Sequence, residues 1–317
     1  MFMKNIVQYL FGKKSSPILP ETVEESVPME RGGGEPATPP VVSSDLNAIV
    51  VSDIGNVRKN NEDTGLFVRL ADEGIRRVKG YLLLVADGMG GHLAGEIASQ
   101  MAAETVSREY FQFRDTTENS LMRAFQIANR QIFDESLQHE TFRGMGTTCT
   151  AVVVQNEQLY FAHVGDSRAY LYKNGQLVQL TEDHTYVQQL LKMGEISEEK
   201  AARHPERNVL TQAMGTKADI RVDLGRCVLP FDTGDRLLLC SDGLYEYCRE
   251  EDLLRLLAQE TLPQVASELV QLAKNRGGHD NITVVLAERT VTRTLPAPRE
   301  TREIDVPFTR DSERAHE

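Results

Sequence analysis

Cysteine is scarce in this chain of 317 residues, and its copies are not arranged as a redox or zinc motif. The four cysteines, none of them in a Cys-x-x-Cys pair, are Cys149, Cys227, Cys240 and Cys248. Cys149 and Cys240 lie within apolar runs, where cysteine acts as a small core residue. The pattern argues against a disulfide scaffold and against a thiolate zinc site, and it favours a reducing, cytoplasmic setting.

Long apolar runs are also absent. No segment approaches the length of about 20 apolar residues that a transmembrane helix requires, so we predict no transmembrane segment. The first fourteen residues do not resemble a signal peptide, because Asn5 and Gln8 interrupt the apolar region. Phe2, Ile6 and Leu10 share one helical face, which leaves a docking helix as the alternative to a frayed extension.

Positive charge is in deficit, with 35 Lys and Arg against 47 Asp and Glu and a net charge of −12. Nucleic acids are bound through basic patches, so we predict no nucleic-acid partner. Small phosphorylated groups stay compatible with this charge, because bound metal ions or local arginines can reverse the sign at a site.

Prolines and glycines mark the ends of the folded region. Residues 15–44 hold six of the twelve prolines and the run Gly32–Gly34, a composition typical of linkers. Residues 291–317 lose all periodicity. We predict a disordered N-terminal extension and linker over 1–45, one domain over 46–290, and a disordered C-terminal tail over 291–317.

Strands and helices do not alternate regularly in the domain. Apolar patterning predicts helices at 94–111, 120–137 and 186–193, and a helical region interrupted at Pro263 over 251–275. It predicts strands at 48–52, 63–70, 80–86, 147–154, 158–163, 167–173, 220–229, 235–240 and 281–288. This order indicates an α+β fold with antiparallel sheets covered by helices, and not a doubly wound parallel sheet.

Aspartates recur at the ends of apolar runs. Asp87, Asp166 and Asp242 each end such a run and are followed by glycine or serine, and Asp280 immediately precedes another. A carboxylate at the mouth of a buried strand is costly unless its charge is compensated. One such aspartate is best explained as a turn residue, but four favour a shared cluster of hard divalent cations with oxygen ligands. The pair Glu62-Asp63 supplies two further candidates.

Three other features bear on chemistry at such a site. The glycine-rich run Gly88–Gly91 lets backbone atoms approach a metal or its waters. His92 closes this loop, where it is either a capping residue or a general acid that protonates a leaving alkoxide. Arg58 is either a solvated loop residue or a bidentate clamp for a phosphoryl group.

Seven motifs together resemble the metal-dependent serine/threonine protein phosphatases of type 2C (the PPM family) in their bacterial form. They occur in the family's order between about residues 47 and 289. They are the stretches 53–63, 87–92, 146–148, 165–168, 210–215, 241–244 and 280–284.

The resemblance implies a four-layer αββα sandwich with a metal site at the edge of two antiparallel sheets, and a mobile flap at about 185–210. It implies two, or even three, Mn²⁺ or Mg²⁺ ions. Asp87 would bridge two ions and Gly88 would bind through its carbonyl, while Asp63, Asp242 and Asp280 would complete the second site. Glu62 would bind an ion through a water molecule, and Asp166 would hold a weaker third ion. Arg58 would bind the substrate phosphate, and His92 would be the general acid.

The resemblance further implies hydrolysis of phosphoserine and phosphothreonine by direct attack of a metal-bridging hydroxide, without a phosphoenzyme. The expected partners are phosphorylated proteins, including a cognate serine/threonine kinase and its substrates. Two alternatives stay open: a catalytically silent regulator that binds phosphoproteins, and a small-molecule phosphatase. The complete carboxylate set favours the protein phosphatase.

Overall fold

The computed structural model describes residues 41–90, 93–259 and 261–294, and its compact unit includes Ser44–Thr290. Two paired strands, β1 (Val41–Asp53) and β11 (Ile282–Thr294), run past the domain boundaries predicted at 46 and 290. The apolar face at residues 2–10 and nearly all of both predicted disordered ends lie outside the described residues. The domain boundaries therefore stay a prediction.

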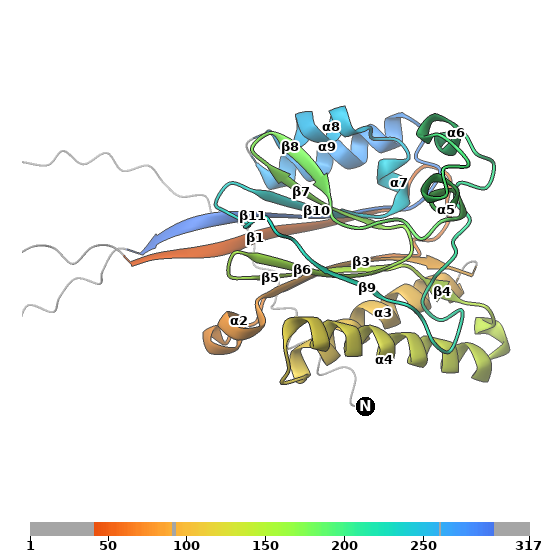
Figure 1. Ribbon diagram of the computed structural model, residues 1–317, viewed down its shortest axis with the longest axis horizontal. Coiled ribbons are helices and arrows are strands. Elements are labelled where there is room, and N and C mark those ends of the chain that lie inside the picture. The colour runs from red at the N-terminus through yellow and green to blue at the C-terminus, as the bar shows by residue number, and fades with distance from the viewer. Residues whose placement is uncertain (1–40, 91–92, 260, 295–317) are drawn as a thin grey trace, which may run out of the picture. The chain divides into compact units, whose positions relative to one another are not determined.

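Two sheets form the middle of this unit (Figure 1). The first has the spatial order β1, β11, β10 (Arg236–Cys240), β7 (Arg168–Lys173) and β8 (Gln176–Gln179). The second has the order β2 (Asp63–Val68), β3 (Tyr81–Met89), β5 (Cys149–Gln155), β6 (Gln158–Val164) and β9 (Asp223–Arg226), with the short β4 (Gly146–Thr147) beside β3. Neighbouring strands are antiparallel, as predicted, in every pairing from β10 with β11 to β6 with β9.

Helices cover the outer face of each sheet (Figure 1). The long helices α3 (Leu93–Gln112) and α4 (Thr117–Gln138) pack on the second sheet. The helices α8 (Glu250–Leu257) and α9 (Leu262–Asn275) pack on the first sheet. The shorter helices are α2 (Glu73–Lys79), the 3-10 helix η1 (Glu140–Phe142), α5 (Tyr186–Lys192), α6 (Glu198–Ala202) and α7 (Asp242–Tyr245). The described residues thus form the predicted αββα sandwich.

The strand β3 shows why its sequence is apolar throughout. Leu82, Leu84 and Ala86 belong to the core under α3 and α4, whereas Leu83 and Val85 belong to the core between the sheets. Successive side chains of a strand point to opposite faces, so a strand covered on both faces needs an unbroken apolar run. All five side chains are fully buried, so this strand is covered on both faces.

Several element bounds differ from the sequence-based expectation. The helix α2 was not predicted, because its polar sequence carries no apolar stripe. The strand β9 covers four residues of the ten predicted at 220–229. Pro263 lies in the first turn of α9 and does not separate the two late helices, which agrees with the preference of proline for the first helical positions. The Ser197 side chain caps α6 by accepting a hydrogen bond from the backbone N–H of Lys200.

Among the described residues, every helix is too short or too polar to cross a membrane.

The burial of β3 leads to a stability prediction. Leu84→Ala should lower the free energy of unfolding by about 2 to 5 kcal/mol, because it removes a fully buried side chain and leaves a cavity. Leu137, which is 69% exposed near the end of α4, is the matched control, and its replacement by alanine should change stability by less than about 0.5 kcal/mol. Urea denaturation followed by circular dichroism measures both, and equal losses in the two variants would contradict this packing.

Candidate metal centre

The five aspartates predicted as ligands come from strand ends that meet at one edge of the sandwich. Asp63 begins β2 and is the register partner of Asp87 near the end of β3. Asp242 follows the end of β10, and Asp280 precedes the start of β11, its antiparallel neighbour. Asp166 lies between β6 of the second sheet and β7 of the first. The topology therefore brings both sheets' carboxylates to the same edge.

Hydroxyl groups hold the two inner aspartates. The Ser241 hydroxyl donates to Oδ2 of Asp63 at 2.7 Å. The backbone N–H of Asp87 donates to the Thr148 hydroxyl at 2.9 Å, and the Asp87 carbonyl accepts from the backbone N–H of Thr148 at 2.9 Å. Asp87 is thus fixed through its main chain by Thr148, while its side chain lies against that of Asp63.

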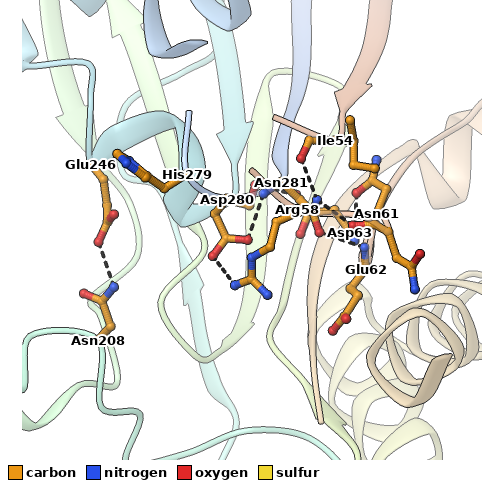
Figure 2. Close-up of polar contacts among 12 residues, drawn as sticks. Ile54, Arg58, Asn61, Glu62, Asp63, Asn208, Glu246, His279, Asp280 and Asn281 are labelled. Carbon is orange, nitrogen blue, oxygen red and sulfur yellow. Dashed lines mark hydrogen bonds and ion pairs between the residues drawn. The ribbon is translucent and has the colours of Figure 1, made fainter. Parts of the chain in front are cut away.

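Arg58 reaches Asp280 from a loop more than two hundred residues away in sequence (Figure 2). Its Nη2 donates to Oδ2 of Asp280 at 2.5 Å, and the two side chains are 48% and 31% exposed. The predicted phosphate clamp therefore lies at the outer rim of the carboxylate cluster. Because the ion pair is solvent-accessible, its contribution to stability is small, and Arg58 can exchange Asp280 for another anion.

Asn281 connects the Arg58 loop to the strands. Its side-chain oxygen accepts from the backbone N–H of Glu62 at 2.8 Å, and its amide donates to the carbonyls of Ile54 and Asn60, both at 3.0 Å (Figure 2). Asn281 is 3% exposed, and an amide buried with these three partners is expensive to replace. The sequence placed Asn281 in a motif but gave it no role.

Glu62 and Gly88 pack closely against the start of α3. The Gly88 N–H donates to the Glu62 carbonyl at 3.1 Å. A Cβ placed on Gly88 would lie 2.1 Å from the Gly95 carbonyl oxygen, and one placed on Gly95 would lie 2.1 Å from Oε2 of Glu62. Only glycine allows this approach, and it brings the Gly88 main chain and the Glu62 carboxylate together beside Asp63 and Asp87.

Burial and mutual repulsion raise the pKa values of these aspartates. For Asp87, burial first and then the charge of Asp63 raise the pKa well above its usual range. For Asp242, burial first and then the charge of Asp166 do the same. Burial raises the pKa of Asp63 to about 6 and that of Asp166 to about 7. Within the described segments, the cluster lacks sufficient counter-charge for its carboxylates to be ionised together at neutral pH.

Two orphaned carboxylate oxygens indicate what the site accommodates. Oδ1 of Asp63 and Oδ1 of Asp242 are buried without a hydrogen-bond partner, and among the described residues only Gln259 Oε1 shares that property. Such an atom is costly in a folded protein unless an ion or water satisfies it. Anionic oxygens without donors are the ligands that Mg²⁺ and Mn²⁺ prefer, so the donor set fits the predicted metals.

The side chains are nevertheless not arranged around a metal position. No group of three or more His, Cys, Asp or Glu in the described segments could hold an ion as it stands. Arg58 and Ser241 occupy one oxygen each of Asp280 and Asp63. Rotation of the Arg58 and Ser241 side chains would release both contacts and leave these oxygens to an ion.

The candidate general acid, His92, lies outside the described residues, as does Gly91. The structure instead adds groups that sequence reasoning missed, namely Ser241, Thr148 and Asn281. All three lie within the family-like motifs, so their position in the sequence was the available signal. Their hydrogen-bond partners are distant in the chain and could not be read from it.

The raised pKa values lead to a pH prediction for the metal-free protein. In the unfolded chain an aspartate has a pKa of about 3.9, so the folded state binds the Asp166 proton more tightly. The stability that this bound proton contributes is lost as pH rises from about 4 to 8. Asp166→Asn removes this penalty. Its free energy of unfolding relative to wild type should increase by about 2 kcal/mol between pH 5 and pH 8. Urea titrations in EDTA measure it, and parallel pH profiles would contradict the prediction.

Comparison with known proteins gives the family. The family model described as "Protein phosphatase 2C" matches residues 70–291. The serine/threonine phosphatase stp of Listeria monocytogenes serotype 4b is 40% identical over 258 residues, which cover 78% of this chain and 98% of that protein. Protein phosphatase PhpP of Streptococcus pneumoniae is 36% identical over 242 residues, or 75% of this chain and 95% of that one.

Solved structures of serine/threonine phosphatases also match this chain. The crystal structure of the Mycobacterium tuberculosis serine/threonine phosphatase PstP/Ppp matches with a TM-score of 0.68 and 36% identity, covering 77% of this chain and 98% of that one. The catalytic domain of the phosphatase PstP in complex with two manganese ions matches with a TM-score of 0.68 and 34% identity, covering 78% of this chain and all of that one. The chain belongs to the protein phosphatase 2C family.

Proposed function

We propose that this protein is a metal-dependent phosphatase that removes phosphate from phosphoserine and phosphothreonine in proteins. The observation that carries the proposal is the meeting of five aspartates from separate segments at one edge of the sandwich, with two carboxylate oxygens left unpaired. Relatives that are 36% to 40% identical over about three quarters of the chain are named protein or serine/threonine phosphatases.

Two Mn²⁺ or Mg²⁺ ions fit this donor set, and a third would be held by Asp166 with Asp242. Asp87, the carbonyl of Gly88, Asp63, Asp242 and Asp280 would hold the first two, with Glu62 acting through water. The similar PstP domain is described in complex with two manganese ions. Bound ions of this kind acidify a water molecule for direct attack on phosphorus and neutralise the phosphoryl oxygens.

Arg58 is suited to bind the substrate phosphate. Its planar guanidinium offers paired donors that match phosphate geometry, and its exposed position lets it exchange Asp280 for the phosphoryl group. This exchange also releases Asp280 to act as a ligand. His92 would protonate the leaving serine or threonine oxygen, a role that rests on its place in the sequence motif after Asp87.

The substrates proposed are phosphorylated proteins, with a cognate serine/threonine kinase among the partners. A cytoplasmic location is proposed as well, and it is supported by four cysteines that are all buried free thiols.

Phosphate release from a phosphothreonine peptide tests the assignment. With Mn²⁺ the wild-type protein should release phosphate, and with EDTA it should not. Asp242→Asn should lower kcat by at least about 100-fold, because the charge that holds the ion is lost, while cooperative unfolding persists. Metal-loaded, folded wild type that releases no phosphate would favour the silent binding regulator. Preference for a nucleotide over the peptide would favour a small-molecule phosphatase.

The role of His92 is tested by leaving groups of different basicity. His92→Ala should reduce kcat about 100-fold for a phosphoserine peptide, because a general acid matters most when the alkoxide is a poor leaving group. The loss for p-nitrophenyl phosphate should be much smaller, since nitrophenolate departs without a proton. Equal losses on both substrates would argue against the general-acid role.

A further inference from the structure

Arg168 is a cation held beside the metal centre without being part of it. It begins β7, two residues after Asp166. Its Nε donates to both oxygens of Asp183, at 2.9 and 3.1 Å, and its Nη2 donates to Oδ2 of Asp183 at 2.6 Å. The two side chains are only 26% and 12% exposed. Such multidentate, charge-assisted bonding fixes both the position and the orientation of a guanidinium.

Two tyrosines complete the enclosure of this guanidinium. Its Nη1 donates to the Tyr170 hydroxyl at 3.2 Å, and its central carbon lies 3.7 Å from the centre of the Tyr245 ring. Tyr245 belongs to α7, the helix that begins with Asp242, and its side chain hydrogen-bonds Asp166. Arg168 is therefore packed against the same residue that contacts a candidate metal ligand.

Asp183 is itself held firmly, so it can restrain its partner. Its segment runs beside the Asp166 loop, with the Leu180 N–H bonded to the Ala169 carbonyl at 2.8 Å and the His184 N–H bonded to the Gly165 carbonyl at 2.7 Å. The predicted flap starts just beyond, at α5. Asp183 therefore has a fixed main chain on both sides of its carboxylate.

Without Asp183, the Arg168 guanidinium would have two other carboxylates to pair with, those of Asp166 and Asp242. Burial and then the charge of Asp166 raise the pKa of Asp242, so the two carboxylates repel each other. Burial raises the pKa of Asp166 and the positive charge of Arg168 acts to lower it, so the guanidinium attracts this carboxylate. Asp242 Oδ1 has no partner of its own. In a site with little water, a free guanidinium would pair with these carboxylates and would compete with a divalent cation for the same oxygens.

We propose that Asp183 is a positioning residue that withholds the Arg168 guanidinium from Asp166 and Asp242, and so keeps that side of the metal centre open to a divalent cation. The inference rests on the proposed function, because it presupposes that these aspartates hold metal. One result separates this positioning role from a purely structural one. If Asp183 restrains Arg168, then replacing Arg168 as well should restore the Mn²⁺ affinity that is lost when the Asp183 charge is removed.

The test is calorimetric titration of the full-length protein with Mn²⁺. Asp183→Asn should weaken the binding of the weakest ion about 10- to 100-fold, the usual effect of losing a group that orients metal ligands. The double variant Arg168→Met/Asp183→Asn should recover most of this loss, because it removes the competing cation and both partners of the buried pair together. Asp183→Glu, which keeps the charge, should stay near wild type.

The matched control is the other buried ion pair of β7. Lys173 bonds Asp235 at 2.6 Å, with side chains 15% and 7% exposed, at the far end of the strand. Asp235→Asn should lower the melting temperature and leave Mn²⁺ affinity unchanged.

Unchanged Mn²⁺ affinity in Asp183→Asn would overturn the proposal, and so would a double variant that binds no better than the single one. If Asp183→Asn does not fold, the double variant is compared directly with wild type. Tenfold weaker Mn²⁺ binding by the double variant would then overturn the proposal. A wild-type protein that binds no Mn²⁺ would instead refute the proposed metal centre.

Discussion

The mutual repulsion of buried carboxylates at one edge of the sandwich is the constraint on which the rest of the site depends. Asp87 and Asp242 have strongly raised pKa values because burial and neighbouring aspartates oppose their ionisation. In the described part of the chain, Arg58 bonds the cluster only at its rim, through Asp280, and Arg168 is engaged by Asp183. A divalent cation is the compensator that matches both the charge and the all-oxygen donor set.

Close packing of main-chain segments, and not only of side chains, holds the carboxylates together at this edge. A Cβ on Gly55 would lie 2.1 Å from the Asp280 carbonyl, and one on Gly243 would lie 2.0 Å from the Asn281 carbonyl. These contacts lock the Arg58 loop and the start of α7 against the residues that precede β11. Glycine in these motifs is thus a packing requirement at the site, which explains why Asp87 and Asp242 are each followed by glycine.

The sequence predicted most of the architecture, and it singled out the aspartates that meet at one edge of the sandwich, for identifiable reasons. The apolar run of β3 and the spaced apolar stripes of α3 and α4 carry periodicity, and the aspartates stand out because carboxylates at strand ends are unusual. What could not be predicted depends on contacts between distant segments. Asn281 is 219 residues from Glu62, and nothing local distinguishes Asp183 as the partner of Arg168.

A crystal structure of the Mn²⁺-loaded protein, with anomalous difference maps for manganese, would show directly whether these aspartates hold metal ions. We expect at least two manganese peaks bounded by Asp87, Asp63, Asp242 and Asp280, with the Arg58 guanidinium no longer bonded to Asp280 and the Arg168–Asp183 pair unchanged. Maps without manganese at these aspartates, from protein that retains its fold and is saturated with the ion, would contradict this expectation.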